Sequence, residues 1–164
     1  MNPLFVLLFC WFFDSPSPEL KEIRNLFPLI STSEKAAEGL KKLSSGKSNS
    51  PVHVAYSAAA EMASAQYKLN PLSKLSTFQK GKNQLEACIH SNAQNVEIRF
   101  IRFAIQTKAP AFLGYKNSIS SDKLFLLGEL KSLRITDSEL YTKICSFLLL
   151  HGSLSPKEKE LLSL

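Results

Sequence analysis

The sequence lacks the patterns of β-strands and of membrane-spanning helices. No segment of its 164 residues convincingly alternates apolar and polar side chains, as a half-buried strand does. The apolar run at residues 4–13 is shorter than the ~20 residues that a membrane helix needs, and no later run approaches that length. There are only six glycines, and the eight prolines stand at the starts and breaks of segments. This distribution favours helices joined by short turns.

Motifs of catalytic and metal sites are missing as well. The chain has no P-loop, no G-x-G-x-x-G and no G-x-S-x-G. Its histidines, His53, His90 and His151, lack the i, i+4 spacing of a helical zinc site. Cys88 cannot share a helical face with His90, and both Cys88 and Cys145 fit apolar faces as small hydrophobes rather than as a disulfide. We therefore expect no metal and no cofactor, and an enzyme is the alternative to a non-catalytic function.

The chain is basic, with a formal net charge of +6. Its lysines are spread along the sequence, and only Lys41 and Lys42 are adjacent. Because no basic run is interleaved with aromatic residues, nucleic acid is not an expected partner. The charge favours weak attraction to anionic surfaces or ligands, and an ordinary solvated basic surface is the alternative.

Residues 1–15 differ from the rest of the chain. The first thirteen, MNPLFVLLFCWFF, carry no charged side chain, and the apolar run has the length of a signal-peptide core. The match is incomplete, because no Lys or Arg precedes the run and no A-x-A precedes Asp14. A lipid anchor at Cys10 and an apolar segment packed onto the core are the alternatives. We predict a signal peptide at residues 1–15 and a periplasmic or secreted protein.

Residues 16–164 are expected to form one all-α domain of seven to eight helices in antiparallel hairpins. Several predicted helix starts carry a capping residue followed by proline, as at Ser17-Pro18 and Ser155-Pro156. Ser31 to Glu34 and Thr136 to Glu139 have the spacing of a capping box, with Ser31 and Thr136 as the caps.

The centre of this domain is predicted at residues 56–105, a helical hairpin followed by the start of a third helix. Small residues, chiefly alanine, repeat at three- and four-residue intervals before Asn70-Pro71, and such a face lets another helix approach closely. Gly81 costs ~1 kcal/mol relative to Ala inside a helix. A close helix crossing is therefore expected at Gly81.

The hairpin resembles the passage from one tetratricopeptide repeat into the next. Four residues stand where that repeat places a small residue, an aromatic, an alanine and a proline: Gly81, Leu85, Cys88 and Ala93. Arg99 and Arg102 depart from the pattern, and no second copy follows at a ~34-residue period. The resemblance implies tetratricopeptide-like packing of this part of the chain.

Over most of residues 16–164 the chain is similar to a group of small exported proteins of Bacteroidetes-type bacteria. The segments that carry this resemblance are Ala55-Tyr56, Phe78 to Gly81, Glu97 to Arg102, Pro110 to Tyr115 and Asp122 to Phe125. The resemblance implies export and a helical fold. It supplies no activity and no catalytic residue.

Arg99 and Arg102 lie one helical turn apart, so their guanidinium groups share a face that Gln106 extends. The forked donors of Arg match carboxylate or phosphate, which makes these residues a candidate anion-binding site. The alternatives are a solvated face and an internal ion pair with a nearby carboxylate, namely Glu61, Glu86 or Glu97.

Residues 108–117 are expected to form a loop that is unusually apolar. Phe112, Leu113 and Tyr115 lie beside Gly114, and they either pack onto the fold or await a partner. The loop is the second candidate recognition element, and an ordered plug over the end of the hairpin is the alternative.

These features predict a non-catalytic binding or scaffolding module of the cell envelope. Its binding residues would be Arg99, Arg102, Gln106, Phe112, Leu113 and Tyr115. Its partner would be another envelope protein or an anionic ligand, and no transmembrane segment is expected in the mature chain. The alternative is an envelope enzyme, which would need a histidine and a carboxylate that converge in a concave pocket.

Export predicts a defined N-terminus. Protein isolated from its native host should begin between Asp14 and Ser17, because cleavage removes the apolar leader. N-terminal sequencing measures this directly, and an intact Met1 would contradict cleavage.

Overall fold

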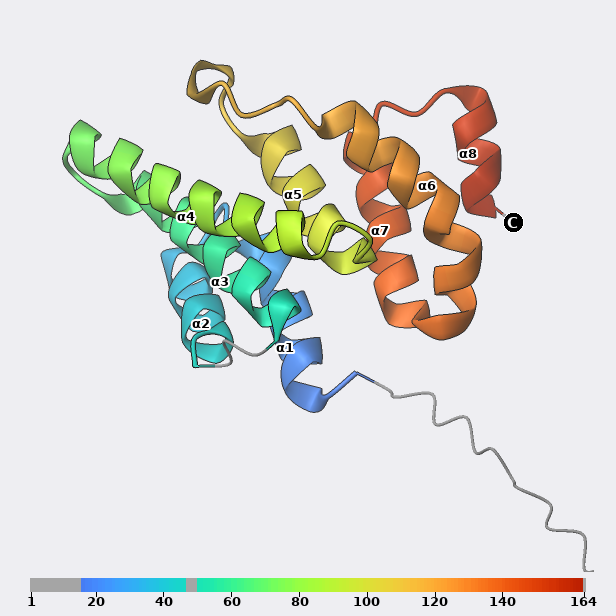
Figure 1. Cartoon of the computed structure of the whole chain (residues 1–164), viewed down its shortest axis with the longest axis horizontal. Helices are drawn as coiled ribbons and strands as arrows, with labels where there is room; N and C mark the ends of the chain where they lie inside the picture. Colours follow the sequence, from blue (N-terminus) through green and yellow to red (C-terminus); the bar gives the residue numbers. More distant parts are fainter. Residues whose placement is uncertain (1–15, 47–49, 164) are drawn as a thin grey trace, which may run out of the picture.

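The structure, a computed structural model, describes residues 16–46 and 50–163 (Figure 1). Within these ranges the chain forms eight α-helices, three short 3-10 helices and no β-strand, which confirms the predicted single all-α domain. The α-helices are α1 (Pro18–Leu26), α2 (Glu34–Ser44), α3 (Pro51–Ser64), α4 (Pro71–Ser91), α5 (Val96–Lys108), α6 (Ile119–Thr136), α7 (Ser138–His151) and α8 (Pro156–Ser163). The signal peptide predicted at residues 1–15 lies outside the described residues. In the described part of the chain, no helix has both the length and the apolar composition to cross a membrane.

Two helix starts follow the capping chemistry of the sequence closely. At α1, Ser17 Oγ accepts a hydrogen bond from the Leu20 amide (3.2 Å), with proline at the first helical position. At α8 the capping box is complete, because Ser155 Oγ accepts from the Glu158 amide (3.3 Å) and Glu158 Oε2 accepts from the Ser155 amide (2.7 Å). The backbone hydrogen bond from Ser155, and then the contact with Lys123, lower the pKa of Glu158 to about 2.

Two other helix starts differ from the predicted ones. α2 begins after Ser33 rather than Ser31, because the chain first makes a hydrogen-bonded turn on the Leu29 carbonyl. α7 is capped by Asp137 rather than Thr136, because α6 continues through Thr136. Both caps accept a hydrogen bond from the amide three residues later, at 3.2 Å in α2 and 3.0 Å in α7. Several polar residues precede each of these helices, so the sequence predicts the capping residue only to within one or two positions.

α3 lies at the centre of the domain and packs against α2, α4 and α5. Four of its eight buried residues are alanine, and α4 lies close alongside it (Figure 1). A Cβ atom on Gly81 of α4 would lie 2.5 Å from Met62 Cγ and 2.7 Å from the Ala58 carbonyl oxygen. The close crossing predicted from this glycine is confirmed, and the Ala-rich face is core.

α5 joins the two halves of the domain. It packs against α3 on one side and against α6 and α7 on another, while α8 lies against α6 (Figure 1). The loop predicted at residues 108–117 connects α5 to α6 and contains a short 3-10 helix, Ala111–Leu113. The tetratricopeptide-like character of the hairpins stays a prediction.

The crossing of α3 and α4 predicts opposite effects for two glycine substitutions. Gly81→Ala should lower the free energy of unfolding by about 1–3 kcal/mol, since the new methyl group meets backbone atoms that cannot move away. Gly128→Ala is the matched control, because Gly128 is helical, exposed and has open space around its Cβ position. It should raise the free energy of unfolding by roughly 0.5–1 kcal/mol. Urea denaturation of both variants measures this, and equal effects would contradict the crossing.

Candidate functional site

Arg99 and Arg102, on the polar face of α5, share the carboxylate of Asp122. Asp122 of α6 has a fully buried side chain and lies between Arg99 and Arg102. It accepts hydrogen bonds from Arg102 Nε (2.7 Å) and Nη2 (2.8 Å), and Arg99 Nε also donates to it. Charge-assisted, forked hydrogen bonds of this kind are among the strongest that side chains make.

Glu86 and Tyr115 extend this arrangement to α4 and to the α5–α6 loop. Arg102 Nη1 donates to Glu86 Oε2 (2.9 Å), and the Tyr115 hydroxyl donates to the other oxygen of the same carboxylate. Gln106 Oε1 accepts a hydrogen bond from the Ser118 amide (3.0 Å). Burial, and then the hydrogen bond to Glu86, raise the pKa of Tyr115 above its ordinary value. The hydroxyl therefore stays protonated and serves as a donor.

We call this group of residues the α5 network; its members are Arg99, Arg102, Gln106, Glu86, Tyr115 and Asp122. Burial alone would lower the pKa of Arg102, but its hydrogen bonds to Asp122 and Glu86 and their charges raise it. Every guanidinium nitrogen of both arginines donates to an internal acceptor, since Arg99 also reaches two backbone carbonyls. An external anion would have to compete with these acceptors, and anion binding by the two arginines stays a prediction.

The α5 network contains four of the six predicted binding residues and one predicted alternative partner. Glu86 was among the carboxylates considered for an internal ion pair, and it does pair with Arg102. Asp122 was not considered, although it is the most buried member. No local spacing connects it to the arginines, because it lies 20 residues beyond Arg102 and on a different helix.

A second buried network ties α1 to α5 and α7. Arg24 donates to both oxygens of Glu97 (2.7 Å each) and to Asp137 Oδ2 (2.7 Å). The Tyr56 hydroxyl donates to Glu97 as well (2.7 Å), and burial with this carboxylate raises the pKa of Tyr56. This network was not predicted from the sequence, because the partners of Arg24 lie 73 and 113 residues away and no local spacing signals them.

The apolar residues predicted in the loop between α5 and α6 differ in their burial. Tyr115 is buried and packs edge-to-face on Phe78, with ring centroids 6.0 Å apart. Phe112 is 86% exposed, whereas Leu113 packs partly against the core. Gly114 has a φ of 60°, a backbone conformation that favours glycine, and the chain turns there. Tyr115 therefore packs onto the fold as one alternative predicted, and recognition of a partner by the exposed Phe112 stays a prediction.

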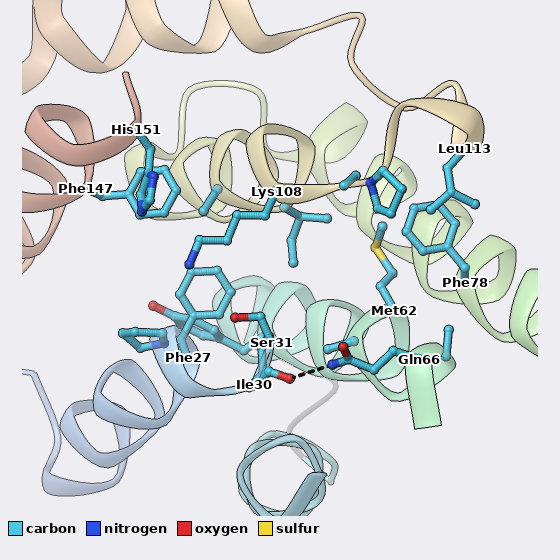
Figure 2. A pocket seen from close by; sticks show the side chains of 18 of the residues that line it. Phe27, Ile30, Ser31, Met62, Gln66, Phe78, Lys108, Leu113, Phe147 and His151 are labelled. Carbon is cyan, nitrogen blue, oxygen red and sulfur yellow. Dashed lines mark hydrogen bonds between the residues drawn. The ribbon is translucent and has the colours of Figure 1, made fainter. Parts of the chain in front are cut away.

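A cavity of about 1150 Å³ lies between α5 and the helices α1, α3, α4 and α7 (Figure 2). Aromatic and aliphatic side chains make up most of its wall, among them Phe27, Met62, Phe78, Phe100, Leu113 and Phe147. Figure 2 shows Phe147 and His151 at one end and Phe78 and Leu113 at the other. The residues of α5 that line the cavity do not belong to the α5 network, so the two sites use different faces of one helix.

The charged side chains of the cavity wall are cationic. Arg24, Lys74, Lys108 and Lys143 line it, and no Asp or Glu of the described residues does. Arg24 is bound by carboxylates outside the wall, and Lys143 Nζ donates to Asn25 Oδ1 (2.7 Å).

Lys108 of α5 extends its side chain along the cavity. Figure 2 shows its side chain extending between Phe147 and Phe27, with the ammonium 5.7 Å from the centroid of the Phe147 ring. Lys108 forms no ion pair with a carboxylate in the part of the chain that the structure describes. The cavity therefore combines an apolar wall with an ammonium group available to an anion.

The histidine of the cavity stands beside an aromatic ring rather than a carboxylate. The rings of His151 and Phe147 are 4.7 Å apart and tilted by 52°. Over residues 16–46 and 50–163, no cluster of three or more His, Cys, Asp and Glu residues is placed to hold a metal ion. Among the described residues, Cys88 and Cys145 are buried and form no disulfide.

Comparison of the chain with protein-family models, with curated proteins and with solved structures found no match. The function is therefore inferred from the geometry of the cavity and of the α5 network.

The burial of Asp122 predicts a large loss of stability when its charge is removed. Asp122→Asn should lower the free energy of unfolding by about 3–5 kcal/mol, because two arginines then lose their shared counter-charge. Glu86→Gln is the control, since its side chain is 36% exposed and exposed pairs contribute about 1 kcal/mol or less. Chemical denaturation compares the two variants. Equal losses would show that Asp122 does not organise the network.

Proposed function

We propose that this chain is an exported, non-catalytic binding protein of the cell envelope whose cavity takes the apolar chain of an anionic amphiphile, such as a long-chain fatty acid. The observation that carries the proposal is the pairing of a large aromatic and aliphatic cavity with Lys108. The cavity exceeds the ~300–1,000 Å³ of most small-molecule sites, so an extended ligand suits it better than a small polar one.

The cavity wall explains why the ligand would be a hydrocarbon. Burial of each methylene contributes ~0.8 kcal/mol, so a chain of roughly ten methylenes supplies about 8 kcal/mol before the entropic costs of binding. The aromatic rings of Phe27, Phe100 and Phe147 provide much of this contact surface. A polar ligand would leave most of its hydrogen-bonding groups unpaired against such a wall.

Lys108 supplies the contact for the head group. It lies at the C-terminal end of α5 and is exposed, so an anionic group bound there stays partly in water. An ammonium ion is a compact charge with three rotatable donors, which suits a carboxylate or a phosphate held at the rim of an apolar site. This contact replaces the anion site first expected at Arg99 and Arg102, whose donors face inward.

The α5 network has a positioning role in this proposal. It fixes α5 against α4 and α6 through Glu86 and Asp122. It also holds Tyr115, which places the neighbouring Phe112 and Leu113 at one end of the cavity. In this proposal, Phe112 and Leu113 contact the ligand. The other four predicted binding residues support them: Arg99, Arg102, Gln106 and Tyr115.

The enzyme alternative has less support from the cavity. General acid–base chemistry would need a histidine oriented by a second polar group within hydrogen-bond reach. His151 lies against Phe147, and the described wall of the cavity carries no carboxylate. A binding function uses the apolar wall and Lys108. A catalytic function would also need a polar group that orients His151.

A substitution that fills the cavity tests the proposal. Ala63→Trp places an indole in the wall and should weaken binding of a fluorescent long-chain fatty acid at least about tenfold, because the ring occupies the space of the ligand. Ala87→Trp is the matched control, since Ala87 is exposed on α4 and does not line the cavity. Binding is measured by fluorescence titration, with circular dichroism to verify the fold.

The head-group contact is tested with the same titration. Lys108→Gln should weaken binding of the fatty acid and leave binding of the corresponding fatty alcohol unchanged, because only the acid carries a charge. No binding to the wild-type protein, or equal binding to both tryptophan variants, would overturn the assignment of the cavity.

A further inference from the structure

An exposed group of apolar side chains lies next to one end of the cavity. Leu69 is fully exposed, and Leu72, Leu75 and Phe112 are 77%, 54% and 86% exposed. The leucines belong to the turn between α3 and α4 and to the first turns of α4, and Phe112 belongs to the α5–α6 loop. We call these four residues the apolar tip. Leu69, Leu72 and Leu75 follow one another within seven residues, and Phe112 is connected to them through the cavity wall that it shares with Leu75.

The apolar tip adjoins the cavity but extends beyond it. Leu75 and Phe112 belong to both, whereas Leu69 and Leu72 do not line the cavity. Figure 1 shows the turn between α3 and α4 at one end of the long axis of the molecule. The turn that carries Leu69 is therefore at an extremity of the molecule, and the tip overlaps the cavity at Leu75 and Phe112.

The segments that form the tip carry only positive charge. No Asp or Glu occurs between Glu61 and Glu86, a stretch that contains Lys68, Lys74, Lys80 and Lys82. None occurs between Glu97 and Asp122 either, the stretch that includes the α5–α6 loop. Lys68 and Lys74 are exposed beside the leucines, and neither forms an ion pair with a described carboxylate. The tip thus combines exposed leucines with uncompensated ammonium groups.

We propose that the apolar tip docks onto an anionic lipid bilayer, with Leu69, Leu72 and Phe112 in the interface and Lys68 and Lys74 at the head groups. Protruding apolar side chains can enter the boundary between head groups and acyl chains, and flanking lysines add electrostatic attraction to anionic lipids. A bilayer needs no matching groove, which a helical partner protein would. Docking would place the end of the cavity at the membrane surface.

The part of the tip formed by Leu69 and Leu72 lies outside the cavity wall, so this proposal can fail by itself. Leu69 and Leu72 do not line the cavity, so their substitution leaves its wall unchanged. The proposal also involves no membrane-spanning segment. Docking of this kind is peripheral and reversible.

Vesicle co-sedimentation tests the proposal with the full chain after residue 15. Wild-type protein should bind vesicles of phosphatidylcholine mixed with phosphatidylglycerol, and bind phosphatidylcholine alone more weakly. Leu69→Glu with Leu72→Glu should lower the partition coefficient at least about a hundredfold. Lys68→Gln with Lys74→Gln should lower it roughly 30-fold on the mixed vesicles and change it little on phosphatidylcholine alone.

The matched control is Leu124→Glu with Ile135→Glu, which replaces two exposed apolar residues of α6 that do not line the cavity. This variant should bind vesicles like the wild type. Fatty-acid binding by the leucine variant should be unchanged, which separates the tip from the cavity.

Equal losses in both glutamate variants would overturn the proposal, as would no wild-type binding to anionic vesicles. Concentration-dependent self-association that only the leucine variant abolishes, without vesicle binding, would identify a second copy of the chain as the occupant of the tip. Vesicle binding that disappears together with fatty-acid binding in the folded leucine variant would show that the two surfaces are one site.

Discussion

The buried carboxylate of Asp122 is the constraint on which the second half of the structure depends. It lies on α6 and neutralises two arginines of α5, so neither helix can move without exposing an uncompensated charge in the interior. Arg102 carries the connection further to Glu86 on α4. Replacement of such a group with apolar residues of similar volume can be neutral in other proteins. What the charges provide here is a fixed orientation of α5.

That orientation gives α5 two functions at once. The face with Arg99, Arg102 and Gln106 is held inward against α4 and α6, and the face with Phe100 and Ala104 is turned toward the cavity. At the start of the same helix, Glu97 binds Arg24 and positions α1 as another wall. A cavity of this size in a small domain would tend to collapse if its walls could shift. The two charged networks explain how the walls stay apart.

The features that could be predicted best from the sequence are those that depend on neighbouring residues. Helical periodicity, capping residues and the glycine at the α3–α4 crossing predicted the fold class and the central hairpin, because each depends on neighbours within one or two turns. Two caps were misplaced by one or two residues, since several polar side chains competed for each position. The candidate site was predicted only in part. Arg99, Arg102, Gln106 and Tyr115 do come together, but Asp122 and Arg24 find partners on distant helices. The cavity arises from five helices, and no single segment signals it.

A crystal structure of the protein with a long-chain fatty acid tests the central assignment most directly. The binding proposal predicts a hydrocarbon chain that runs from the Phe147 and His151 end toward Phe78 and Leu113, with its carboxylate nearest Lys108 among the charged residues. A carboxylate bound instead at Arg99 and Arg102, with Asp122 displaced, would contradict it and restore the anion site first expected from the sequence.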